Sequence, residues 1–83
     1  MRPTEIGQVV QYHRKRAGLS RKELSRLSNV SPSVIYEIEH GKKTVQMNSL
    51  MNLLNALNLT LDIKGPLVKE YYDRLAKREN IND

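Results

Sequence analysis

Two groups of side chains in the first half of the chain have types and spacing suited to contacts with a polyanion. The first group is small or polar, lies within an apolar helical pattern, and consists of Ser31, Pro32, Ser33, Tyr36 and Glu37. The second group is basic, flanks the first on both sides, and consists of Arg21, Lys22, Lys42 and Lys43. Basic side chains neutralise phosphates whatever the sequence, whereas short polar side chains on a helix can reach the edges of bases. These residues are therefore the candidate nucleic-acid contacts.

The net charge of +5 supports a polyanionic partner because of where the charge lies. Residues 1–45 hold nine Lys or Arg and four Asp or Glu, so they carry the whole excess, while residues 46–83 are balanced. A one-sided basic surface suits nucleic acid. The charge alone is equally compatible with an ordinary solvated face.

Length and composition indicate one small domain and exclude several classes of protein. Eighty-three residues form a single core, and a core of this size is often marginal without a partner. The absence of Cys excludes disulfides and thiolate metal sites. No segment is apolar enough for a membrane span or a leader, so we expect a cytoplasmic protein. The His residues are isolated and the serines lack a neighbouring base, so we expect no metal, no cofactor and no enzymatic activity.

Two helices are predicted before the candidate base contacts. The first runs from about Thr4, a plausible N-cap, and ends at Gly18. Ser20 caps the second, with Glu23 three residues later in the pattern of a capping box. The inward side of this second helix is predicted to consist of Leu24 and Leu27.

A tight turn and a third helix follow. Asn29 tolerates the left-handed conformation that such a turn requires. Ser31 is the predicted cap of the third helix, and Pro32 occupies its first position, where a missing N–H costs nothing. Gly41 ends the helix, whose apolar side is Val34, Ile35 and Ile38.

The remaining residues predict a fourth helix, a strand and a fifth helix. The apolar side of the fourth helix is Met47, Leu50, Met51, Leu54 and Leu57, and Asn58 ends it. Residues 59–64 alternate apolar and polar side chains, which is typical of a half-buried strand. Residues 66–80 then form an amphipathic helix, and residues 79–83 look frayed.

A lone strand needs a partner for its backbone N–H and C=O groups. The chain offers no second strand, so the simplest partner is the same strand of another copy across a two-fold axis. The alternative is a short helix capped by Thr60, against which Gly65-Pro66 argues because that helix would stop almost at once.

Residues 6–63 resemble the lambda-repressor-like, or Cro/XRE, helix-turn-helix domain. The resemblance rests on Gly18-Leu19-Ser20, Glu23-Leu24, Val30-Ser31, Ile38-Glu39 and Gly41-Lys42. Together with the elements predicted above, it gives a mainly α, five-helix lambda-repressor-like fold with one short β-strand that pairs across a dimer. Residues 4–58 would form the DNA-binding core, residues 59–64 the dimerisation strand through Leu59, Leu61 and Ile63, and residues 66–80 the C-terminal helix. It also implies that Arg14 pairs with Glu39 as a structural salt bridge.

The resemblance implies that residues 31–33, Tyr36 and Glu37 lie at or near base edges in the major groove of double-stranded DNA. Two features depart from the family pattern: Arg21 stands where Gln is usual, and the third helix lacks long amide side chains. Arg21 can still reach phosphate or guanine. Specificity would then rest partly on DNA shape and half-site spacing.

The tail is similar to that of HipB-type antitoxins, which dimerise through a small β-ribbon. This similarity implies a dimeric repressor that regulates its own operon and binds a kinase-like HipA toxin. The alternative is a stand-alone Cro/XRE-family regulator with no toxin partner. The last helix would either pack within the dimer or bind a partner protein.

Overall fold

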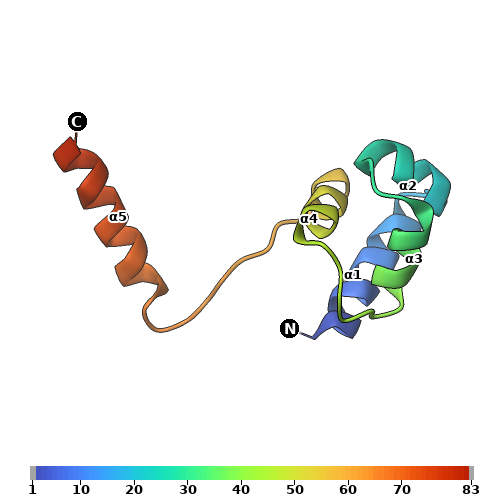
Figure 1. Ribbon diagram of the computed structural model, residues 1–83, viewed down its shortest axis with the longest axis horizontal. Coiled ribbons are helices and arrows are strands. Elements are labelled where there is room, and N and C mark those ends of the chain that lie inside the picture. Colours follow the sequence, from blue (N-terminus) through green and yellow to red (C-terminus); the bar gives the residue numbers. More distant parts are fainter. Residues whose placement is uncertain (1, 83) are drawn as a thin grey trace.

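The computed structural model describes residues 2–82, and the side chains of residues 79–82 are not described. The protein is mainly helical. Its helices, in chain order, are α1 (Pro3–Arg16), α2 (Arg21–Ser28), α3 (Pro32–Glu39), α4 (Met47–Ala56) and α5 (Val68–Asn82). Figure 1 shows α1 to α4 packed together and α5 standing apart at the end of an extended segment. None of the described helices is long and apolar enough to cross a membrane.

One apolar core holds α1 to α4 together, and we call these four helices and their connections, residues 2–58, the body. The fully buried side chains are contributed by all four helices and by the turn between α2 and α3. The core consists of Val10, Leu24, Val30, Ile35, Ile38, Leu50, Leu53 and Leu54. Because α3 contacts α1, α2 and α4, it is held from several sides and presents only its outer side to solvent.

The turn between α2 and α3 forms as the sequence predicts. Ser20 accepts a hydrogen bond from the Glu23 backbone N–H at 3.0 Å, and Glu23 accepts one in return from the Ser20 backbone N–H, which completes the capping box. Asn29 is left-handed, with φ of 62°. Ser31 caps α3 by accepting a hydrogen bond from the Val34 N–H at 3.2 Å, and Pro32 is the first residue of that helix. These local bonds fix where α3 begins.

Gly7 allows α1 and α3 to approach closely. A Cβ at Gly7 would overlap the carbonyl oxygen of Ile38 and lie 2.9 Å from that of Glu39. Gly7 is thus the point of contact between α1 and the end of α3. Any larger residue would push the two helices apart.

The predicted strand over residues 59–64 is wrong for the single chain. Residues 2–82 contain no strand, and residues 59–64 form an irregular connection between α4 and α5. The physical reason is that the backbone N–H and C=O groups of a strand need hydrogen bonds to a neighbouring strand, and the single chain supplies no such strand. Leu59 is half-buried against the body's core, whereas Ile63 is 74% exposed.

Some predicted helix boundaries are also wrong. The first helix begins at Pro3, with Arg2 as an N-cap that makes no side-chain hydrogen bond, so Thr4 is not the cap. The last helix begins at Val68 rather than at residue 66 and extends to Asn82, whereas Asp83 lies outside the described residues.

Three side chains predicted to face the core are exposed instead: Leu27, Met47 and Met51. In α2 the buried positions are Leu24 and Ser28, one turn apart. The Ser28 hydroxyl donates to the Leu24 carbonyl at 2.7 Å and accepts from the Val30 N–H at 3.2 Å. A serine therefore fills the buried position. The apolar pattern predicts Leu27 there, but Leu27 is 64% exposed.

Candidate nucleic-acid interface

The candidate base contacts lie on the outer side of α3. Ser31, Pro32 and Ser33 are all exposed at the start of the helix, and Tyr36 follows them one turn later. Their backbone is fixed by the Ser31 cap and by the buried Ile35 on the opposite side of the helix. The first turn of α3 is thus a rigid, small-residue surface with the partial positive charge of a helix N-terminus.

A buried ion pair fixes the other end of α3, as the resemblance predicts. Arg14 Nε donates to Glu39 Oε2 at 2.6 Å, and a second Arg14 nitrogen donates to Oε1 at 3.1 Å. Arg14 also donates to the Leu19 carbonyl at 2.9 Å, so it links α1, the connection before α2 and the end of α3. Burial raises the pKa of the Glu39 carboxyl, but the hydrogen bonds and charges of Arg14 and Arg21 outweigh burial and hold that pKa below its ordinary value.

Arg21 is engaged inside the body, which the sequence does not predict. Its Nε donates to Glu39 Oε1 at 3.1 Å, and its NH2 lies 3.0 Å from the same oxygen. The Arg21 side chain is two-thirds buried, and its guanidinium carbon lies 5.1 Å from the centre of the Tyr36 ring. Only fold geometry brings the first residue of α2 to the last residue of α3, so no sequence signal could have identified this contact.

Lys42 and Glu37 pair with each other. Lys42 Nζ lies 3.1 Å from Glu37 Oε2, and both side chains are partly exposed. From the sequence, Lys42 is expected to contact phosphate and Glu37 a base edge. The Lys42 charge instead cancels the repulsion that Glu37 alone would exert on a phosphate backbone. Because the ion pair is exposed, it adds only modestly to the stability of the protein.

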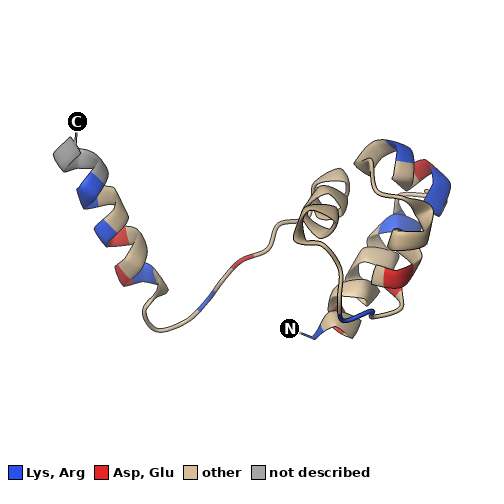
Figure 2. Cartoon of the chain, in the orientation of Figure 1, with Lys and Arg blue, Asp and Glu red and all other residues tan. Residues whose placement is uncertain are grey.

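Lys22 and Lys43 are the candidate phosphate contacts that remain unengaged, since no described carboxylate lies within ion-pair distance of either. Figure 2 shows blue segments on α2 and in the connection that follows α3, so basic residues lie both before and after α3 in the chain. We call the outer side of α3, together with Lys22 and Lys43, the candidate interface.

His40, an isolated histidine in the sequence, lies directly beside the candidate interface. Its ring stacks on Tyr36 with centres 3.8 Å apart and an angle of 20° between the planes. His40 Nδ1 lies 2.8 Å from the Tyr36 carbonyl oxygen. The four-residue spacing of Tyr36 and His40 on a helix is the signal that could have predicted the contact.

The sequence matches the helix-turn-helix family model over residues 10–64, which covers α2, α3, α4 and the second half of α1. An uncharacterised helix-turn-helix transcriptional regulator of Sinorhizobium fredii is 33% identical over 64 residues, covering 77% of this chain and 84% of that protein. One from Haemophilus influenzae is 40% identical over 56 residues, covering 68% of this chain but only 57% of that protein.

A solved structure has the same arrangement of helices. The restriction-modification controller protein C.AhdI from Aeromonas hydrophila superimposes with a TM-score of 0.63 at 28% identity, covering 70% of this chain and 88% of that one. The family match spans more than half of the chain and includes both helices of the candidate interface. The chain belongs to the Cro/XRE-type helix-turn-helix family of DNA-binding transcriptional regulators.

Proposed function

We infer that this chain is a repressor that binds a specific operator as a dimer, with α3 of each copy in the major groove. The observation that carries the proposal is the exposed first turn of α3, held rigidly by the Ser31 cap and flanked by the unengaged Lys22 and Lys43. A helix whose N-terminal residues are small and exposed can enter the major groove closely.

The binding roles are assigned from these contacts. Ser31, Pro32, Ser33 and Tyr36 are the proposed base-edge residues, and Lys22 and Lys43 the proposed phosphate contacts. Lys42 and Glu37 act as a pair at the edge of the interface, because their charges are already matched. Arg21 contributes mainly from within the body, through Glu39.

Salt dependence tests the proposed phosphate contacts. The Lys22→Ala and Lys43→Ala variants should each weaken binding to all duplexes and reduce the slope of log affinity against log salt by about one. Lys69→Ala and Lys77→Ala, on α5, are matched controls that should change neither. Measurement needs wild-type and variant titrations of labelled duplex DNA at several salt concentrations. Unchanged slopes for Lys22→Ala and Lys43→Ala would reject this docking surface.

The dimer is proposed to form through residues 59–64, paired between two copies, with Leu59, Leu61 and Ile63 at the contact. Leu59 already donates its N–H to the Leu54 carbonyl at 2.8 Å, but no described backbone acceptor receives the N–H groups of residues 60–64. Those groups are therefore available to a second copy. Leu61 and Ile63 are also exposed apolar side chains in the single chain.

A proline substitution tests this dimer. Leu61→Pro removes a backbone donor and should yield monomers with poor operator binding, whereas Asp62→Asn leaves the backbone unchanged and should remain dimeric. Sedimentation at low micromolar concentration distinguishes the two states. A dimeric Leu61→Pro protein would place the interface elsewhere.

A second candidate function is that of a HipB-type antitoxin that binds a kinase-like HipA toxin and autoregulates its operon. The observation that favours it is an exposed apolar surface on α5 and the turn before it, formed by Leu67, Tyr71, Tyr72 and Leu75. The alternative, a stand-alone Cro/XRE-family regulator, needs no such surface, and the similarity to a restriction-modification controller fits that alternative. Co-purification with the product of a neighbouring gene would support the antitoxin role, provided that Tyr71→Lys abolishes it. A complex that survives Tyr71→Lys would assign the contact to another surface.

A further inference from the structure

One aromatic side chain of the candidate interface is held from two directions. Tyr36 is 51% exposed, yet its ring stacks on His40 at 3.8 Å and lies 5.1 Å from the Arg21 guanidinium carbon. A carbonyl oxygen only accepts hydrogen bonds, so the Nδ1 of His40 donates to the Tyr36 carbonyl. That bond fixes the imidazole against the ring beside it.

The Arg21 contact is anchored in the core of the body. Both contacts of Arg21 with Glu39 are 3.0–3.1 Å long, and Glu39 is in turn held by Arg14. The Glu39 side chain has no exposed surface. The guanidinium beside Tyr36 is therefore positioned by a buried carboxylate and does not move as a free surface arginine would.

Tyr36 also differs from its neighbours on the outer side of α3. Residues 31–33 are small, and Glu37 is paired with Lys42. Tyr36 is thus the one large side chain among the proposed base contacts of α3. An aromatic ring makes apolar contact with the methyl group of thymine, a group that marks thymine in the major groove.

We propose that His40 and Arg21 are positioning residues that hold the Tyr36 ring for contact with a thymine methyl group. This proposal rests on the proposed function, because it requires α3 to lie in the major groove. The stack restricts the ring before DNA arrives, so less conformational freedom is lost on binding. The preferred sites should therefore contain a thymine at one fixed position in each half-site.

The first experiment measures base preference. Wild-type protein selects sites from a randomised duplex library, and His40→Ala and His40→Phe are then put through the same selection. His40→Ala should retain DNA binding but relax the preference for thymine, and His40→Phe should restore it because a phenyl ring can still stack. Arg21→Ala should relax the same position, and thermal unfolding shows whether each variant is folded.

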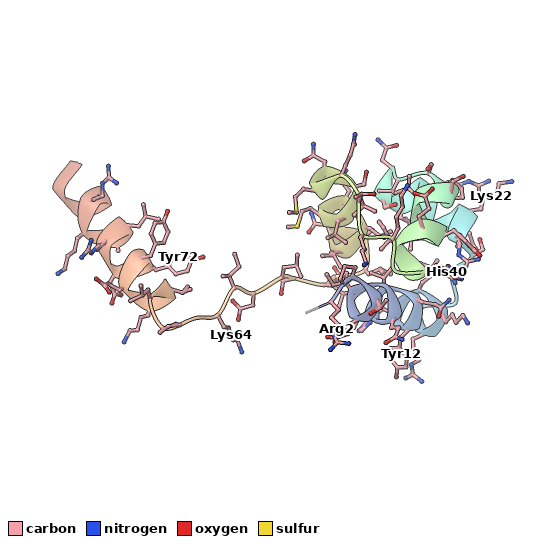
Figure 3. All side chains as sticks on the ribbon, turned by 60° about the horizontal axis from the view of Figure 1, so that its bottom comes forward. Arg2, Tyr12, Lys22, His40, Lys64 and Tyr72 are labelled. Carbon is pink, nitrogen blue, oxygen red and sulfur yellow. The ribbon has the colours of Figure 1, made fainter. Side chains whose placement is uncertain are left out.

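His13 supplies a matched control. Its Nδ1 lies 2.7 Å from the Val9 carbonyl, as that of His40 lies close to the Tyr36 carbonyl, but its ring meets Tyr12 edge-on, with centres 5.5 Å apart and an angle of 77° between the planes. His13 therefore shares the hydrogen bond of His40 without the stack. Figure 3 shows Tyr12 on the side of α1 away from Lys22. His13→Ala should leave the selected sequences unchanged. A loss of thymine preference in His13→Ala, or none in His40→Ala, would overturn the role of the stack.

The second experiment tests the methyl group itself. Uracil in place of the selected thymine removes one methyl group and should weaken wild-type binding about fourfold, the value of one buried methyl. The same uracil replacement should not weaken DNA binding by the Tyr36→Ala variant. Tyr36→Phe should behave as wild type, and a Phe variant that loses the preference would show that the hydroxyl, not the ring, makes the contact.

These outcomes separate the proposal from the proposed function. If wild-type protein selects no sites, the proposed function itself fails. If it selects sites whose thymine preference does not depend on Tyr36 or His40, DNA binding stands and the inference about the stack is wrong.

Discussion

Buried polar side chains in the body have hydrogen-bond partners, whereas most of the described large apolar side chains in the tail, residues 59–82, face solvent. No described side-chain nitrogen or oxygen in the body is buried without a hydrogen-bond partner. In the tail, Leu67 is 70% exposed, and the side chains of Tyr71 and Tyr72 are more than half exposed. Figure 3 places Tyr72 on a helix that is distant from the body. The difference teaches that the body satisfies its buried polar groups within one chain, while the tail leaves apolar side chains exposed.

Removal of the Glu39 carboxylate should have the largest effect on the body. Glu39→Ala leaves Arg14 buried without its partner, and such a change costs about 3–5 kcal/mol of unfolding free energy. Glu70→Ala breaks the exposed pair with Arg74 at 3.0 Å in the tail and should cost less than about 0.5 kcal/mol. Chemical denaturation of both variants measures the contrast. Equal losses would mean that the tail is as tightly integrated as the body.

Acid should reproduce part of that loss without a substitution. The pKa of Glu39 is lowered in the folded protein, so the folded state binds the proton less tightly than the unfolded state. The ion pair therefore contributes fully above the ordinary value of 4.5, and its contribution is lost as the pH falls through the folded pKa. Denaturation midpoints measured from pH 7 downward should decline less steeply in Glu39→Gln than in the wild type. Parallel declines would show that other groups control acid stability.

A methyl group at Gly7 should destabilise the body by about 2–3 kcal/mol, because the Cβ would overlap the Ile38 carbonyl and the helices must separate. Gly65→Ala is the tail counterpart, since its Cβ would meet only Val68 Cγ2 at an ordinary 3.6 Å. That variant should unfold at nearly the wild-type midpoint. A tolerated Gly7→Ala would contradict the close approach of α1 and α3.

Loss of the α2 cap should have the smallest of these effects. Ser20→Ala removes the side-chain half of the capping box and should cost about 1 kcal/mol. Ser20→Asn, which can still accept the Glu23 N–H, should recover most of that stability. Failure of the asparagine variant to recover would show that the serine acts through something other than the cap.

The sequence predicted the local parts of the interface well. The capping box, the left-handed Asn29 and the start of α3 at Ser31-Pro32 are confirmed. The Arg14–Glu39 pair, expected from the family resemblance, is also present. The prediction of buried residues was wrong where apolar spacing did not match the packing of the helices. Leu27 fits the apolar spacing of α2, but Ser28 occupies the buried position.

Tertiary structure alone decided which polar groups meet. The sequence by itself determined a basic, mainly helical chain and the points at which α2 and α3 begin, because caps and turns depend on residues three or four positions apart. It did not determine that Arg21 would bind Glu39 or that residues 59–64 would stay irregular in one chain. Those outcomes depend on how helices cross and on whether a partner is present, and neither is encoded in any short stretch of residues.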